Sequence, residues 1–289
     1  MMIETFIQIH PVSTYLFLGV IFLCVGSFLN VLIYRLPFML QAHWANDCHI
    51  LLKLETTPLV PLTLFYPRSF CPACKKNIPW WHNIPLLSYL FLRGRCHHCH
   101  HSIPWHYPLV EVVCCMLSLL TLAHFGLHLM VIFPLLFVWG LIGLFVIDMQ
   151  HQLLPDSLTL GLLWLGLFVN INAVFTPLPI AVLSAAGAYL ALWLFIHLFY
   201  LLSGKVGMGH GDFKLFAAFG AWFGWTQLPF ILICSSLTGA LIGTFYLKIT
   251  HQTKDTPIPF GPFLCLAGLL SLFFGSEILH WYFSTILIS

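Results

Sequence analysis

Apolar runs long enough to cross a bilayer constrain the fold of this chain more than any other feature. A transmembrane helix needs about 20 mainly apolar residues, and we predict eight such spans. They cover roughly residues 12–34, 108–125, 128–148, 157–175, 179–203, 213–226, 228–249 and 261–283. The sixth is short and is interrupted by Gly220 and Gly224. We therefore predict an all-α polytopic membrane protein with about eight transmembrane helices.

The composition supports a membrane location for these runs. Hydrophobic residues make up 60% of the chain and charged residues only 7%, whereas a soluble domain has about 25% charged residues. Because so few polar side chains cannot cover a water-exposed surface, we expect much of the apolar surface to face lipid. Residues 1–10 contain Glu4 but no lysine or arginine. They lack the basic segment of a cleavable signal peptide, so the first apolar run is predicted to remain as a helix.

The basic residues predict the orientation. With eight spans and the N-terminus outside, all 11 lysines and arginines fall on one side of the membrane. The positive-inside rule makes that side the cytoplasm. Both termini are therefore predicted to be extracytoplasmic. The basic residues are Arg35, Lys53, Arg68, Lys75, Lys76, Arg93, Arg95, Lys205, Lys214, Lys248 and Lys254.

Four of the ten cysteines form a metal-type motif. Cys71 and Cys74 make one CxxC pair, and Cys96 and Cys99 make a second. Two such pairs can supply four thiolates to one tetrahedral Zn²⁺, and four protein ligands leave no open position for water. Because disulfides are disfavoured in the cytoplasm, we predict a structural zinc site in a zinc-ribbon-like loop. Two alternatives stay open: free thiols, or replacement of one cysteine by a histidine from His97, His98, His100 or His101.

The other six cysteines show no metal-type spacing and mostly lie in apolar runs, and we interpret them as small buried apolar side chains. The predicted chain thus has three parts. Residues 1–34 form the first transmembrane helix, 35–107 a cytoplasmic zinc-binding loop domain, and 108–289 a seven-helix membrane bundle. We find no convincing internal repeat. The remaining cysteines are Cys24, Cys48, Cys114, Cys115, Cys234 and Cys265.

Two aspartates stand at the predicted cytoplasmic ends of spans. Asp148 closes the apolar run 141–148, and Asp212 lies in the glycine-rich segment 207–214. Carboxylates at such positions are costly unless they are paired or solvated, so they are functional candidates. Two that share one proton can act as general base and general acid, which is the chemistry of an aspartic protease. The alternative is that each only caps a helix. For Asp156, which precedes an apolar span, we favour this capping role.

Five motifs occur in order along the chain. They are Gly26–Pro37, the CxxC pairs with Arg93–Cys96, Tyr107–Glu111, Ile147–Asp156 and Gly207–Lys214. Together they resemble the type 4 prepilin peptidases, a family of GxGD-type membrane aspartic proteases also called prepilin leader peptidases/N-methyltransferases. The resemblance runs over roughly residues 20–270. One departure is Gln41, where many relatives have glutamate.

The resemblance implies a bifunctional enzyme of the bacterial inner membrane. It implies cleavage of type IV prepilins and type II secretion pseudopilins after a glycine, with Asp148 and Asp212 as the catalytic pair. It also implies methylation of the new N-terminal amine by S-adenosylmethionine. No methyl-donor motif is readable in the sequence, so the resemblance names no residues for that site.

Two other functions are compatible with parts of the sequence. A peptidase without methyltransferase activity is one alternative. A proton- or metal-coupled transporter with Asp148 and Asp212 as a relay is another, but we see no inverted repeat with paired broken helices. A P-loop sequence is absent, and we expect no nucleic-acid partner.

Overall fold

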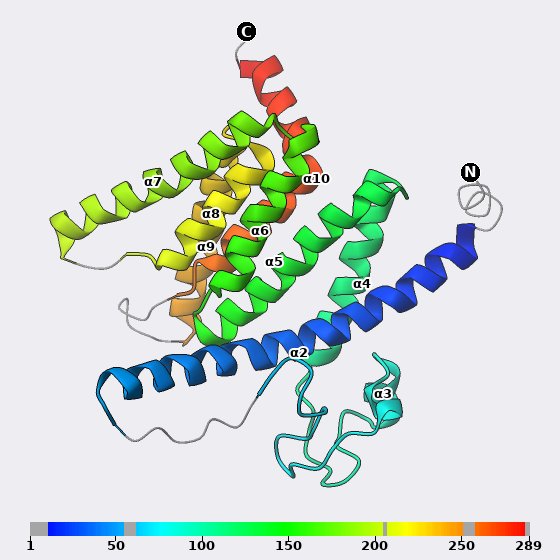
Figure 1. Ribbon diagram of the computed structural model, residues 1–289. Coiled ribbons are helices and arrows are strands. Elements are labelled where there is room, and N and C mark those ends of the chain that lie inside the picture. The colour runs from blue at the N-terminus through cyan, green and yellow to red at the C-terminus, as the bar shows by residue number, and fades with distance from the viewer. Residues whose placement is uncertain (1–10, 55–61, 205–206, 251–257, 287–289) are drawn as a thin grey trace. The chain divides into compact units, whose positions relative to one another are not determined.

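The computed structural model describes residues 11–54, 62–204, 207–250 and 258–286. Within these ranges the chain is almost wholly helical, and its only β-type pairing is two isolated bridges in the cysteine loop. The all-α prediction is therefore confirmed. The chain divides into two compact units between Val131 and Ile132 (Figure 1).

The first unit is built on two packed helices and the cysteine loop. Its elements are α2 (Pro11–Leu51), η1 (Trp80–Asn83), α3 (Leu87–Phe91), α4 (His106–Phe125) and η2 (Leu129–Val131). α2 and α4 pack closely because Gly26 lacks a side chain: a Cβ atom there would lie 2.7 Å from Glu111 Cα. Because α4 packs on α2, it belongs to the same compact unit as the cysteine loop, and that unit ends at Val131. The sequence instead predicts a domain boundary between residues 107 and 108, before α4.

The predicted end of the first helix at residue 34 is wrong. α2 has 41 residues and continues through Pro37 to Leu51. A proline removes only one backbone hydrogen bond, and the residues after it include the good helix formers Met39, Leu40 and Gln41. The segment that was assigned to the loop therefore begins as helix.

Arg35 lies within this extension and is buried, although the sequence suggested a simple loop charge. Its guanidinium donates hydrogen bonds to the carbonyl oxygens of Thr63 at 2.8 Å, Leu64 at 3.3 Å and Pro67 at 2.6 Å. A buried cation is tolerated when its donors are satisfied in this way. Arg35 thus fastens the returning chain to α2.

The second unit is a helical bundle around α8. Eleven of the 14 residues of α8 are buried, and it contacts α6, α7, α9 and α10 (Figure 1). Glycines allow the close approach: a Cβ atom at Gly220 would lie 2.6 Å from Ser184 O on α7. The elements are α5 (Ile132–His151), α6 (Asp156–Val169), η3 (Asn170–Asn172), α7 (Leu178–Ser203), α8 (His210–Phe223), α9 (Leu228–Thr250) and α10 (Gly261–Ile286).

Asn170 fixes the far end of α8. Its side-chain amide donates to the carbonyl oxygens of Ala221 at 2.8 Å and Trp222 at 3.0 Å. Its own oxygen accepts from the backbone N–H groups of Phe175 and Thr176. The Asn170 side chain therefore supplies hydrogen-bond partners to the last carbonyl groups of α8 and to two backbone N–H groups of the loop before α7. Asn170 thus ties the C-terminal end of α8 to the loop before α7.

Six described helices are long and apolar enough to cross a membrane. α6 and α8 have 14 residues each, which is about 21 Å at 1.5 Å per residue and shorter than the roughly 30 Å hydrocarbon core. Each predicted apolar segment therefore corresponds to a helix, in the same order along the chain. The number of membrane crossings, predicted as eight, is approximate. The six are Val12–Leu51, His106–Phe125, Leu129–His151, Leu178–Ser203, Leu228–Ile249 and Gly261–Thr285.

Candidate active site and metal centre

Asp148 lies near the C-terminal end of α5 and is buried. Its carboxylate accepts a hydrogen bond from the backbone N–H of Gly261, the first residue of α10. A Cβ atom on Gly261 would lie 2.6 Å from Asp148 Oδ2. Only glycine therefore allows the start of α10 to lie against this carboxylate.

Asp212 is the third residue of α8 and is also buried. Its Oδ2 accepts a hydrogen bond of 3.2 Å from the backbone N–H of Gly209, so one oxygen does cap the helix. Its Oδ1 is buried and has no hydrogen-bond partner among the described residues. Helix capping therefore explains the position of Oδ2 only. Oδ1 is not used by the cap and could contact another group.

Leu154 connects the surroundings of the two aspartates. A Cβ atom on Gly211 would lie 2.7 Å from Leu154 Cβ, and one on Gly261 would lie 3.2 Å from Leu154 Cδ1. The chain before Asp212 and the chain beside Asp148 therefore pack on the same side chain. Burial, and then the nearby charge of Asp148, raise the pKa of Asp212 above its ordinary range. Both acids are therefore buried, and they lie close enough for the charge of Asp148 to act on Asp212.

The capping role predicted for Asp156 is wrong. α6 begins at Asp156 itself, Pro155 occupies the N-cap position, and no side chain caps the helix. The Asp156 carboxylate instead binds Lys214 Nζ through both oxygens, at 2.6 and 2.7 Å. Since Lys214 follows Asp212 by two residues, this ion pair connects the two aspartate motifs. No sequence pattern indicates this pairing, because packing of α6 against α8 creates it.

The four predicted cysteines lie together in the first unit. The Sγ atoms of Cys71, Cys74, Cys96 and Cys99 all lie within 4.8 Å of one another. The Cys71 and Cys99 sulfurs are 3.8 Å apart. Thiolates about 2.3 Å from a tetrahedral Zn²⁺ lie about 3.8 Å from each other, so the spacing fits zinc. No histidine nitrogen of the described residues joins this cluster.

The two cysteine pairs have the same backbone geometry. In each, the N–H of the first cysteine bonds to a carbonyl five residues later: Cys71 to Lys76 at 3.0 Å, and Cys96 to His101 at 2.9 Å. The residue after the second cysteine has positive φ, 58° at Lys75 and 55° at His100. Both pairs match C-x₂-C-x₃-I-P-W. The chain therefore contains a short internal repeat, and the expectation of none is wrong.

Backbone donors also favour the metal-binding form of one thiol. The N–H groups of Cys99 and His98 lower the pKa of Cys96 to about 7. A thiolate rather than a thiol is the metal ligand. Burial and the neighbouring cysteines raise the pKa of Cys99 to about 11, so the thiolate is favoured at Cys96 and not at Cys99.

Known families match both units. Residues 20–125 match the family described as "Bacterial Peptidase A24 N-terminal domain", and residues 135–244 match the "Type IV leader peptidase family". The chain belongs to the type IV leader peptidase family. The resemblance predicted from the motifs is therefore confirmed. The second match contains Asp148 and Asp212, and the first contains all four clustered cysteines.

Individual members of this family are similar over almost the whole chain. A Legionella pneumophila protein named "Prepilin leader peptidase/N-methyltransferase" is 56% identical and covers 97% of this chain and 98% of its own length. Proteins of the same name from Stutzerimonas stutzeri and Pseudomonas aeruginosa are 46% and 44% identical, over 96% and 94% of this chain and the same shares of their own. No solved structure shows significant similarity to the chain.

Proposed function

We propose that this protein is a prepilin leader peptidase and N-methyltransferase, with Asp148 and Asp212 as its catalytic pair. The relatives that carry this name match nearly the full length of the chain. The observation that carries the peptidase assignment is the buried pair itself, in which Asp212 Oδ1 has no hydrogen-bond partner among the described residues. Its substrates would be type IV prepilins and type II secretion pseudopilins.

The pair supports a simple hydrolytic sequence. One carboxylate, ionised, takes a proton from water as that water attacks the scissile carbonyl carbon. The other, protonated, donates its proton to the carbonyl oxygen. Collapse of the tetrahedral intermediate breaks the C–N bond. The leaving amine takes a proton from the first carboxyl group, while a hydroxyl of the intermediate returns its proton to the second carboxylate and so restores the pair. The products are a leader with a C-terminal carboxylate and a mature protein with a free N-terminal amine.

The cysteine cluster would hold a structural Zn²⁺. Four thiolates complete a tetrahedral site, so the ion has no position for an attacking water and takes no part in hydrolysis. Its binding energy would instead fold the loop between α2 and α4. S-adenosylmethionine, when bound, supplies an electrophilic methyl group to the N-terminal amine that cleavage releases.

The distribution of basic residues supports an orientation in the bacterial inner membrane. The cysteine loop and the aspartates would lie on the cytoplasmic side, and both termini on the periplasmic side. A reporter fused near Lys75 should read cytoplasmic, and one fused after Ser289 should read periplasmic. If both reporters read the same side, the orientation with eight crossings is wrong.

One experiment tests both activities. The enzyme is co-expressed with a prepilin, and the pilin N-terminus is analysed by mass spectrometry. We expect loss of the leader after a glycine and a gain of one methyl group. Cleavage without methylation would leave the peptidase assignment and remove the methyltransferase. An uncleaved prepilin would contradict the peptidase itself.

A further inference from the structure

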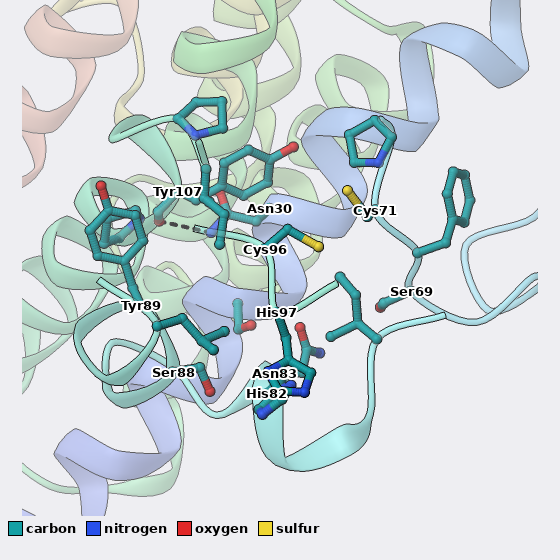
Figure 2. A pocket seen from close by; sticks show the side chains of 18 of the residues that line it. Asn30, Ser69, Cys71, His82, Asn83, Ser88, Tyr89, Cys96, His97 and Tyr107 are labelled. Atoms are coloured by element: carbon teal, nitrogen blue, oxygen red, sulfur yellow. Dashed lines mark hydrogen bonds between the residues drawn. The ribbon is translucent and has the colours of Figure 1, made fainter. Parts of the chain in front are cut away.

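The first unit contains a cavity of about 290 Å³ between α2, α4 and the cysteine loop (Figure 2). All of its lining residues belong to this unit. Small-molecule sites in proteins usually begin at about 300 Å³, so the cavity is of ligand size. It plays no part in the aspartate chemistry described above.

The wall of the cavity includes a buried carboxylate. Glu111 on α4 is 9% exposed. It accepts hydrogen bonds from the backbone N–H of Leu86, at 2.9 Å, and from the Ser27 side chain. Among the described residues no lysine, arginine or histidine forms an ion pair with it. A buried negative charge without a cation is costly, and a cation bound in the cavity would reduce that cost.

Other parts of the wall offer different chemistry. Tyr89 and Tyr107 both line the cavity, and the Asn30 side chain donates to the Tyr107 carbonyl oxygen at 2.9 Å (Figure 2). Elsewhere on the wall are the rings of His82 and His97, whose centroids are 4.8 Å apart. Aromatic faces can stack on a planar base, and imidazoles can donate to a carboxylate.

We propose that this cavity binds S-adenosylmethionine, and that Glu111 pairs with a positive charge of this methyl donor. The proposal rests on the proposed methyltransferase activity. The donor combines a purine base, a ribose, a carboxylate and two cationic groups, the sulfonium and the ammonium. The aromatic rings, the imidazoles and the one carboxylate of the wall match these parts.

The site would also depend on the metal centre. Cys71 and Cys96 are among the lining residues, so the folded cysteine pairs form part of the wall. Loss of zinc should therefore open the cavity and abolish donor binding.

Titration calorimetry of the purified full-length protein with S-adenosylmethionine tests the proposal directly. We expect the wild-type protein to bind the donor and Glu111→Gln to weaken binding about tenfold or more. Glutamine keeps an oxygen that can accept from Leu86 and Ser27, so the substitution removes mainly charge. The matched control is Glu277→Gln, which removes a carboxylate from α10 in the other unit and should leave affinity unchanged.

A second variant covers the case in which Glu111→Gln does not fold. Ile84 lines the cavity and is 41% exposed. Ile84→Trp should therefore fill the space without disturbing a core, and should abolish binding. Zinc content and prepilin cleavage show whether each variant is folded.

The outcomes separate this proposal from the proposed function. If the wild-type protein methylates and binds the donor while Glu111→Gln and Ile84→Trp, both folded, bind it equally well, the donor site is elsewhere. If the wild-type protein neither binds the donor nor methylates, the methyltransferase assignment fails as well. If a peptide with the N-terminal sequence of the mature pilin loses affinity for Glu111→Gln and the donor does not, the cavity belongs to the methyl acceptor and the proposal is wrong.

Discussion

The cysteine cluster and the aspartate pair are built in opposite ways. Each cysteine pair is shaped by its own turn, with the same backbone hydrogen bonds and the same positive φ after the second cysteine. The aspartates come from α5 and α8, and no local motif brings them together. Their positions depend on α10, which approaches Asp148 at Gly261, and on Leu154, which packs under Gly211 and Gly261.

This difference predicts different responses to damage. The cysteine cluster brings together four thiols that a Zn²⁺ ion would hold in place, so the folding of this loop should depend on bound zinc. The two aspartates are positioned by close packing around Gly211 and Gly261, so larger side chains at these glycines should displace them. Substitutions in the two units can test that contrast.

The largest effect is expected from the aspartates themselves. Asp148→Asn and Asp212→Asn should each reduce cleavage by about 10³-fold or more, because asparagine cannot accept or share the proton. The double variant should be little worse than either single one, since the pair acts as a unit. Prepilin cleavage followed over time measures this. Near wild-type cleavage by Asp148→Asn would show that another acid is catalytic.

A smaller effect is expected from Gly261→Ala. The new Cβ atom would meet Asp148 Oδ2 at 2.6 Å and must displace it. A shift of about 1 Å in a catalytic group can cost about 10²-fold in rate. The matched control is Gly187→Ala on α7, where a Cβ atom meets nothing within 4 Å. Equal cleavage rates for the two variants would mean that packing at Gly261 does not position Asp148.

Loss of zinc should affect cleavage less than Gly261→Ala does. Purified protein is expected to carry about one zinc per chain, and Cys71→Ser or Cys99→Ser should lose it. Because the aspartates lie in the other unit, cleavage should decline only through unfolding of the loop. Metal analysis and circular dichroism follow both changes. A rapid block of cleavage by a chelator, with the loop still folded, would point to a metalloprotease.

The smallest effect is expected at the ion pair between the aspartate motifs. The Asp156 side chain is 61% exposed, and exposed ion pairs contribute about 0.2–1 kcal/mol. Asp156→Asn and Lys214→Met should therefore lower cleavage by no more than about fivefold. The thermal unfolding midpoint and the cleavage rate check this. Complete loss of cleavage in either variant would give the pair a role in the reaction itself.

The membrane fold and the members of both polar clusters could be predicted from the sequence alone. Apolar runs specify helices because a backbone in lipid must satisfy its own hydrogen bonds. The CxxC pairs specify the cysteine cluster because their ligand spacing is local. Asp148 and Asp212 are candidates because each closes or opens a predicted apolar span, and the family resemblance implies that they act as a pair.

The contacts that join distant segments are visible only in the folded chain. Folding buries Arg35 against the carbonyl groups of the returning loop. It pairs Asp156 with Lys214, and it sets Glu111 into a cavity wall beside Leu86. None of these contacts has a local pattern, because each arises where two helices or a helix and a loop pack together. Packing is a property of the folded chain, and no short run of residues encodes it.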